Sequence, residues 1–147
     1  GGYPQKHLLV IRADGQGDVT SSRLVWQSDG KDRAAYVPTP VLYGDLLFTV
    51  NEGGTLRCYE KLSGKLLWSE DLDEPFYSSA VVVGDRVYLF GREGGGWVYR
   101  AAAKPERLAF SRFGPGVWAT PVFLDDGIYL RTLDSVCLLK NKASESE

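Results

Sequence analysis

The sequence repeats itself with a period of about 40 residues, and this periodicity constrains the fold more than any other feature. Three short motifs open the repeats, 40 and 41 residues apart, and an aromatic residue stands eight positions after each. The matching positions are Pro40, Ala80 and Pro121 for the motifs, and Phe48, Tyr88 and Tyr129 for the aromatic residues. Repeats of this length are typical of propeller blades and solenoid units, each of which packs against its neighbours.

The content of each repeat predicts β-strands. Leu46–Val50 and Arg86–Phe90 are rich in β-branched and aromatic residues. Glycine-containing pairs such as Gly44-Asp45 and Gly84-Asp85 separate them as tight turns. No segment has ten residues with helical periodicity, and recurring prolines disfavour helices further. The chain therefore reads as short antiparallel strands joined by hairpins.

These features predict an all-β fold, a partial β-propeller of about three and a half four-stranded antiparallel blades. Several strands are apolar on both faces, which suits blades that are covered by a neighbour on each side. Residues 1–147 are expected to form one such unit. Its predicted parts are a blade remnant at 7–28, blades at 38–72 and 78–113, an incomplete blade at 118–140 and a polar tail at 141–147.

A second series of aromatic residues gives the expected contacts between blades. Trp26, Trp68 and Phe110 are spaced 42 residues apart. We expect each to pack its strand against the adjacent blade, because a recurring aromatic residue buries a large area from water. Gly54 and Gly64 are expected to be structural residues of the same repeat, at turns where glycine relieves strain.

Residues 54–68 carry a resemblance to a known repeat. They include Gly54, Leu56, Ser63-Gly64 and Trp68, and they resemble the pattern G-x-L-Y-A-L-D-A-x-T-G-x-x-x-W of the pyrroloquinoline-quinone-type (PQQ-like) propellers. Pro38-Thr39-Pro40-Val41 is similar to the opening of that repeat. Cys58 stands where the family has a small residue, and the second repeat has Lys104-Pro105-Glu106 in place of the T-G turn.

The resemblance implies a quinoprotein-like or WD40-like fold and several different functions. Family members are typically bacterial and periplasmic or secreted, with rings of seven or eight blades. Some are non-catalytic scaffolds, such as the lipoprotein that assists outer-membrane barrel assembly. Others are quinone-dependent dehydrogenases, which hold PQQ with calcium on the propeller axis. A third group comprises extracellular sensor domains attached to kinases.

Charge and hydropathy bear on partners. The net charge is −2, from 17 basic and 19 acidic residues, whereas a nucleic-acid surface needs a basic excess. No apolar run approaches the ~20 residues of a membrane helix. The chain has no methionine and does not begin with a signal peptide, so we expect it to be a piece of a longer protein.

Neither catalytic nor metal-binding residues are predicted. His7, the single histidine, begins a strand and is expected to be solvated. Cys58 and Cys137 are expected to be reduced and largely buried, since a whole blade should separate them. Gly94-Gly95-Gly96 lacks the lysine and helix of a phosphate loop and reads as a hairpin turn.

A series of acidic residues recurs at spacings of 38, 41 and 41. Each precedes glycine or serine at a turn, where carboxylates usually accept hydrogen bonds from nearby backbone N–H groups. We therefore expect them to stabilise turns and to point outward along the rim rather than to converge on calcium. The residues are Asp14, Glu52, Glu93 and Asp134.

Aromatic residues just before the innermost strand of each repeat are the candidate partner contacts. In propellers this position faces the central channel, where ligands and partners dock. The competing interpretation is that they only cap the inner edge of each blade. The candidates are Tyr36, Tyr77 and Trp118, with Arg33 and Arg112 nearby in sequence.

The favoured function is a non-catalytic binding or scaffold module that presents a face or channel to a protein or polymer partner, without a cofactor. The alternative is a piece of a PQQ-dependent dehydrogenase whose cofactor site lies in other blades. We also expect a homo-oligomer, because exposed blade faces and open strand edges favour association. Strand 23–28 of one copy is a candidate to complete the third blade of another.

Overall fold

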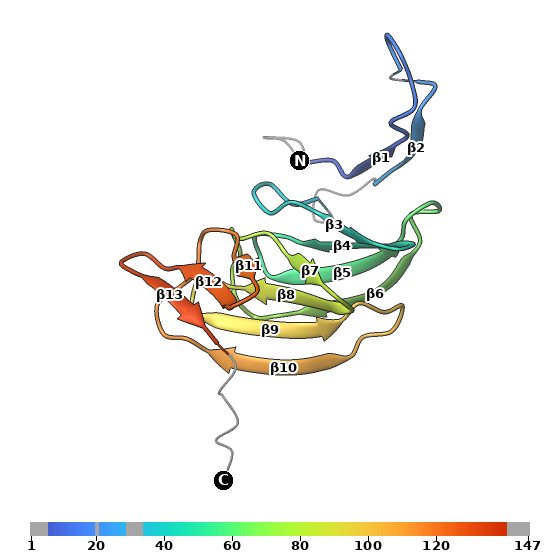
Figure 1. The fold of residues 1–147 in the computed structure, drawn as a ribbon. Helices are drawn as coiled ribbons and strands as arrows, with labels where there is room; N and C mark the ends of the chain where they lie inside the picture. Colours follow the sequence, from blue (N-terminus) through green and yellow to red (C-terminus); the bar gives the residue numbers. More distant parts are fainter. Residues whose placement is uncertain (1–5, 20, 29–33, 141–147) are drawn as a thin grey trace.

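The computed structural model describes residues 6–19, 21–28 and 34–140, and within them it is an all-β structure of four antiparallel sheets (Figure 1). This confirms the predicted fold class. The polar tail at 141–147 and Arg33 lie outside the described residues. The described residues contain no helix long and apolar enough to cross a membrane.

Two of the sheets are complete, with four strands in chain order. Each strand pairs with the next through a hairpin, as the glycine-containing turns predict. The first sheet contains β3 (Val41–Tyr43), β4 (Leu46–Val50), β5 (Thr55–Glu60) and β6 (Leu66–Asp71). The second contains β7 (Val81–Val83), β8 (Arg86–Phe90), β9 (Gly95–Arg100) and β10 (Arg107–Arg112).

The other two sheets have fewer strands, and they lie at the two ends of the row of sheets in Figure 1. The N-terminal pair consists of β1 (Leu9–Ile11) and β2 (Leu24–Gln27). The C-terminal sheet consists of β11 (Val122–Leu124), β12 (Gly127–Arg131) and β13 (Val136–Leu139). Its register matches the first three strands of the complete sheets, because Val122 pairs with Tyr129 as Val81 pairs with Tyr88.

Three apolar clusters lie between successive sheets and hold the row together. We call these the N-terminal interface (β1–β2 against β3–β6), the first interface (β3–β6 against β7–β10) and the second interface (β7–β10 against β11–β13). The first interface is the largest and includes Phe48, Leu56, Trp68, Leu89 and Tyr99. Burial of such side chains contributes ~1.5–3 kcal/mol each.

The start of each sheet is joined to the next by a hydrogen bond that repeats. The amide of Thr39 donates to Oγ of Ser79 at 2.8 Å, and the amide of Ser79 donates to Oγ1 of Thr120 at 3.2 Å. Strands β3 and β7 also contact each other, whereas the later strands of the sheets diverge. The first strands therefore lie on the inner side of the arc, as in a propeller.

A β-bulge at the same place in three sheets fixes which residues are equivalent. The register shifts between Val10 and Ile11, between Cys58 and Tyr59, and between Tyr99 and Val98 where they pair with β10. The residues that directly follow the bulged residue on the same strand are Trp26, Trp68 and Ala109. Ala109, and not Phe110, is thus the counterpart of Trp68.

Phe110 therefore does not take the place toward the next blade that Trp68 has. It pairs with Trp97, and their rings lie 5.1 Å apart on the face toward the first interface. Successive residues of a strand point to opposite faces, so a spacing of 42 instead of 41 reverses the direction of the side chain. Phe110 is 47% exposed.

Gly54 and Gly64 both need to be glycine, for steric reasons. Gly54 has a φ of 92° and a Cβ there would overlap the backbone carbonyl of Glu74. Gly64 has a φ of 69° and a Cβ there would overlap the ring of Trp26. Both positions combine the left-handed region with a close approach, which only glycine tolerates.

Candidate functional site

The residues just before the first strand of each sheet form what we call the inner edge: Tyr36, Tyr77 and Trp118. The repeating hydrogen bonds from Thr39 to Ser79 to Thr120 begin two or three residues later and hold this edge together. Tyr77 and Trp118 come from successive sheets, and their rings meet edge to face at 5.1 Å. The structure therefore brings two of the three predicted aromatic residues into direct contact.

Arg92 completes this contact, although the sequence analysis did not identify it. Its guanidinium carbon lies 4.3 Å from the ring centre of Tyr77 and 3.9 Å from that of Trp118. A guanidinium at such distances is attracted to the face of an aromatic ring. Nε of Arg92 and Nε1 of Trp118 are both enclosed and have no hydrogen-bond partner among the described residues.

The third aromatic residue, Tyr36, is held by a carboxylate. Glu52 Oε1 accepts hydrogen bonds from the amides of Tyr36 and Val37, the latter at 2.7 Å. Lys6 binds the other oxygen of Glu52 at 2.9 Å and lies 6.0 Å from the ring centre of Tyr36. The side chain of Tyr36 is 52% exposed. Its backbone is fixed, while its ring faces solvent.

Burial alone raises the pKa of Glu52. Hydrogen bonds from Lys6, from its own backbone amide and from the amides of Val37 and Tyr36 outweigh burial, and the pKa lies below its ordinary value. Glu52 is thus a carboxylate at neutral pH. Besides its own amide, Glu52 binds the segment before its sheet, so its role extends beyond the turn that was expected.

The acidic series is not a set of equivalent positions. The pairing of Val50 with Leu56 corresponds to that of Phe90 with Gly96, which makes Glu52 the counterpart of Arg92 and not of Glu93. Asp14 lies in the connection between β1 and β2 and pairs with Arg23 at 3.5 Å. Only Asp134 behaves as expected, accepting local hydrogen bonds from Thr132 and Ser135, which lower its pKa.

Glu74 is a buried carboxylate that no pattern in the sequence distinguishes. It is 3% exposed and accepts hydrogen bonds from the amides of Glu93 at 2.6 Å and Gly95 at 3.1 Å. It lies in the segment before β7 and reaches the turn after β8. At Glu52 the turn residue reaches the preceding segment, so the two sheets make the same connection in opposite directions.

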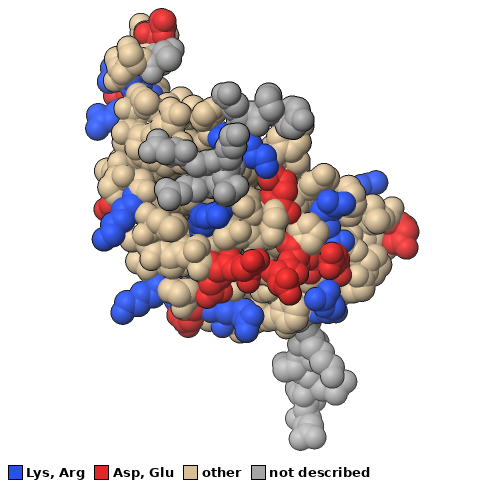
Figure 2. Space-filling model, turned by 180° about the vertical axis from the view of Figure 1, so that it is seen from behind, with Lys and Arg blue, Asp and Glu red and all other residues tan. Residues whose placement is uncertain are grey.

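Arg112 does not lie with Tyr77 and Trp118. It is on β10, where NH1 donates to the carbonyl of Glu93 at 3.3 Å and lies 3.8 Å from Glu74. Beside it, a groove of about 250 Å³ runs between β6 and β10, with Glu70, Asp71 and Asp73 on one wall. Acidic side chains also gather in a band across the face seen in Figure 2.

The described residues contain no group of three or more side chains placed to hold a metal ion. Nδ1 of His7 lies 3.3 Å from the side-chain amide nitrogen of Gln27. Cys58 is free and fully buried, and burial raises its thiol pKa to about 12. Cys137 is free and packs against the apolar cluster of the second interface, where it is less enclosed than Cys58.

The inner edge thus offers aromatic faces, a guanidinium held between two of them, and a fixed, exposed tyrosine. These groups can bind by stacking, by cation–π attraction and by N–H donation. Arg92 had a detectable signal in the sequence, because it lies one repeat length, 40 residues, after Glu52. Glu74 had none, because its role depends on where the turn after β8 lies.

Comparison with known proteins gives one family. The family described as outer membrane protein assembly factor BamB matches residues 16–106 of the chain. No match was found among curated proteins.

Three solved structures are similar in fold. The crystal structure of BamB from Moraxella catarrhalis aligns with a TM-score of 0.68 and 14% identity, over 89% of this chain and 36% of that chain. A europium-containing methanol dehydrogenase aligns with a TM-score of 0.55 and 18% identity, over 74% and 22%. The computationally designed Ika4 protein aligns with a TM-score of 0.64 and 16% identity, over 94% and 87%. The chain spans about a third of the BamB structure.

Proposed function

The chain belongs to the family of outer membrane protein assembly factor BamB, and from this premise we propose that it is a non-catalytic propeller module that binds a protein or polymer partner. The surface we assign to this binding is the inner edge. The observation that carries the proposal is the stack of Tyr77, Arg92 and Trp118, beside an exposed Tyr36 with a fixed backbone.

These residue types suit a binding surface. Tyrosine, tryptophan and arginine dominate the binding energy of protein interfaces. An enclosed N–H group without an acceptor costs free energy. Arg33 and Arg112 were predicted as further contacts, and Arg112 has its guanidinium exposed on β10, away from the stack.

Site-specific photo-crosslinking in the native cell tests the proposal. A photoreactive phenylalanine analogue at Tyr36 should give a discrete crosslinked product, which the additional change Arg92→Ala weakens severalfold. The matched control is Leu62, an apolar residue at least as exposed as Tyr36, in the turn between β5 and β6. If Tyr36 gives no product, or Leu62 gives the same one, the inner edge is not the binding surface.

The family membership also supports a periplasmic or secreted location for the protein. Fractionation of the native cell with an antibody against the chain tests this. Recovery with periplasmic or outer-membrane proteins is expected, and recovery with cytoplasmic proteins contradicts it.

We also infer that the chain associates with further copies of itself. The outer face of the C-terminal sheet exposes Val122, Leu124 and Val136, and the N-terminal pair exposes Leu9 and Ile11. Contiguous apolar surface of this kind favours association. Light scattering over a concentration series should give a mass above 16.2 kDa that rises with concentration. A constant monomer mass contradicts the inference.

A further inference from the structure

A tryptophan occupies the same place in two of the three interfaces. Trp26 lies 6.0 Å from Tyr59 of the next sheet, and Trp68 lies 6.0 Å from Tyr99, measured between ring centres. Each indole N–H donates to a carbonyl that follows the partner tyrosine, Lys61 at 2.8 Å and Ala102 at 3.1 Å. The tryptophan thus seals one sheet against the next.

At the second interface this pair is absent. The register places Ala109 where the other sheets have tryptophan, and Leu139 where they have Tyr59 and Tyr99. Neither side chain has the length to span the gap that an indole and a phenol fill elsewhere.

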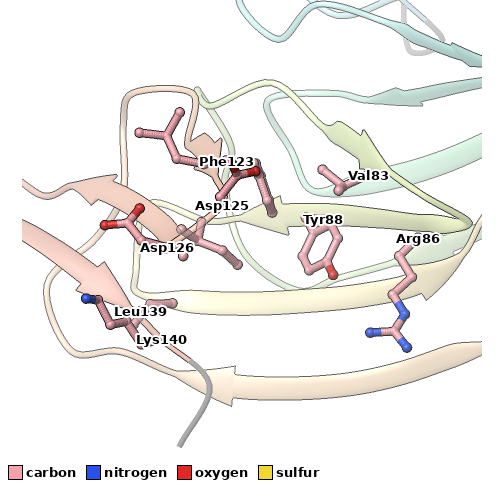
Figure 3. Close-up of a pocket in the computed structure, with 11 residues that line it drawn as sticks. Val83, Arg86, Tyr88, Phe123, Asp125, Asp126, Leu139 and Lys140 are labelled. Carbon is pink, nitrogen blue, oxygen red and sulfur yellow. The ribbon is translucent and has the colours of Figure 1, made fainter. Parts of the chain in front are cut away.

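A groove of about 630 Å³ lies at this interface, between the β7–β8 hairpin and the C-terminal sheet (Figure 3). It is lined by the counterparts of the residues that hold Trp68. Tyr88 corresponds to Phe48, which lies 6.0 Å from Trp68, and Leu139 corresponds to Tyr99. Phe123 faces Tyr88 across the groove at 4.8 Å between ring centres.

The rim of the groove is charged at both ends, and it differs from the first interface at Arg86. Arg86 lies at one end in Figure 3, while Asp126 and Lys140 lie at the other. The counterpart of Arg86 in the first sheet is Leu46, which packs against the apolar cluster of the first interface. Charged side chains of both signs thus surround an aromatic floor. Such a site suits a peptide, whose polar main chain binds the charges while one large aromatic side chain enters the groove.

We propose that this groove binds an aromatic side chain, preferentially tryptophan, from an extended peptide segment of a partner protein. The ring takes the place that Trp26 and Trp68 occupy at the other interfaces. The rim charges bind the peptide groups on either side of it. This site lies between two sheets and is independent of the inner edge.

The first test is an NMR titration of the isotope-labelled chain with a capped Gly-Trp-Gly peptide. Saturable shifts are expected for the amides of Tyr88, Phe123 and Leu139, with a capped Gly-Ala-Gly peptide causing none. Equal shifts with both peptides overturn the proposal. So do shifts confined to Tyr77, Arg92 and Trp118, which would leave the proposed function intact.

The second test fills the groove from within. Ala109→Trp restores the missing indole and should weaken Gly-Trp-Gly binding at least tenfold, while Ala103→Trp, on an exposed turn, should leave it unchanged. Should Ala109→Trp fail to fold, Tyr88→Ala gives the same answer, because it removes the floor. Its control is Phe110→Ala, on the opposite face. Unchanged binding in Ala109→Trp or Tyr88→Ala contradicts the assignment.

Discussion

The first and second interfaces are built on the same backbone register, yet one is sealed and the other is open. At the first, Trp68 is 8% exposed, contacts Phe48 and Tyr99, and donates to a carbonyl of the next sheet. At the second, Ala109 and Leu139 take the places of Trp68 and Tyr99 and a groove remains. The propeller repeat thus fixes the arrangement of the sheets, while individual residues decide how tightly they close.

The largest effect on stability should come from removing Trp68, which closes the first interface. Trp68→Ala is expected to lower the free energy of unfolding by about 3–5 kcal/mol, because it leaves a cavity between two sheets. Phe110→Ala, which removes an exposed ring, should cost about 1 kcal/mol or less. Urea denaturation of both variants measures the difference. Equal losses would mean that the seal is not at Trp68.

The reactivity of the two cysteines should also differ between the two interfaces. Cys58 belongs to the first interface and Cys137 to the second. Burial raises the pKa of Cys58 to about 12, so little thiolate forms at pH 8. Cys137 should react with a thiol reagent about a hundredfold faster, a difference of about 2.8 kcal/mol in barrier. Single Cys→Ala variants assign the two rates, and equal rates contradict the contrast.

The buried carboxylate of Glu74 in the second sheet should matter more than the partly buried Glu52 in the first. Glu74→Ala leaves the enclosed amide of Gly95 without its acceptor, which costs about 1–3 kcal/mol. Thermal unfolding measures this loss. Glu74→Gln keeps an acceptor oxygen and should lose less, and a larger loss for Gln than for Ala would contradict the assignment.

Converting the open interface into a sealed one should stabilise the chain. Ala109→Trp is expected to raise the free energy of unfolding by about 0.5–2 kcal/mol, the usual gain from filling a cavity. Urea denaturation measures the gain. A loss of stability would show that Leu139 and Tyr88 do not form a place for an indole.

The smallest effect concerns pH. The pKa of Glu52 lies below its ordinary value of 4.5. Its contribution is therefore complete above the unfolded pKa and is lost as the pH falls through the lower folded pKa. Glu52→Gln should cost under about 1 kcal/mol at pH 7, and the variant and wild type should converge near about pH 3. Unfolding measured across pH 3–7 checks this, and a gap that widens in acid contradicts it.

The periodicity predicted the fold class well, because the strand pairs at Phe48 and Tyr88 need only apolar strands and glycine turns. It did not show that Phe110 is out of register with Trp68, where a shift of one residue reverses the face. The bulge beside Trp68 that fixes this register is a feature of the paired strands and has no sequence signature.

The candidate site was predicted in part for the same reason. Tyr36, Tyr77 and Trp118 could be found because each lies four or five residues before the first strand of its repeat. Arg92 was missed because Glu93 follows it and looked like the partner of Glu52. The groove depends on Ala109 and Leu139, two unremarkable residues whose meaning appears only when their counterparts are aligned in space.

The hydrogen bonds from Thr39 to Ser79 and from Ser79 to Thr120 have a direction, since an amide always donates forward to the hydroxyl of the following sheet. Two copies that met through identical faces would set amide against amide or hydroxyl against hydroxyl. Any assembly that continues this bond must be heterologous, with the C-terminal face of one copy against the N-terminal face of another. Such contacts generate closed rings when the rotation between copies allows it, and open filaments when it does not.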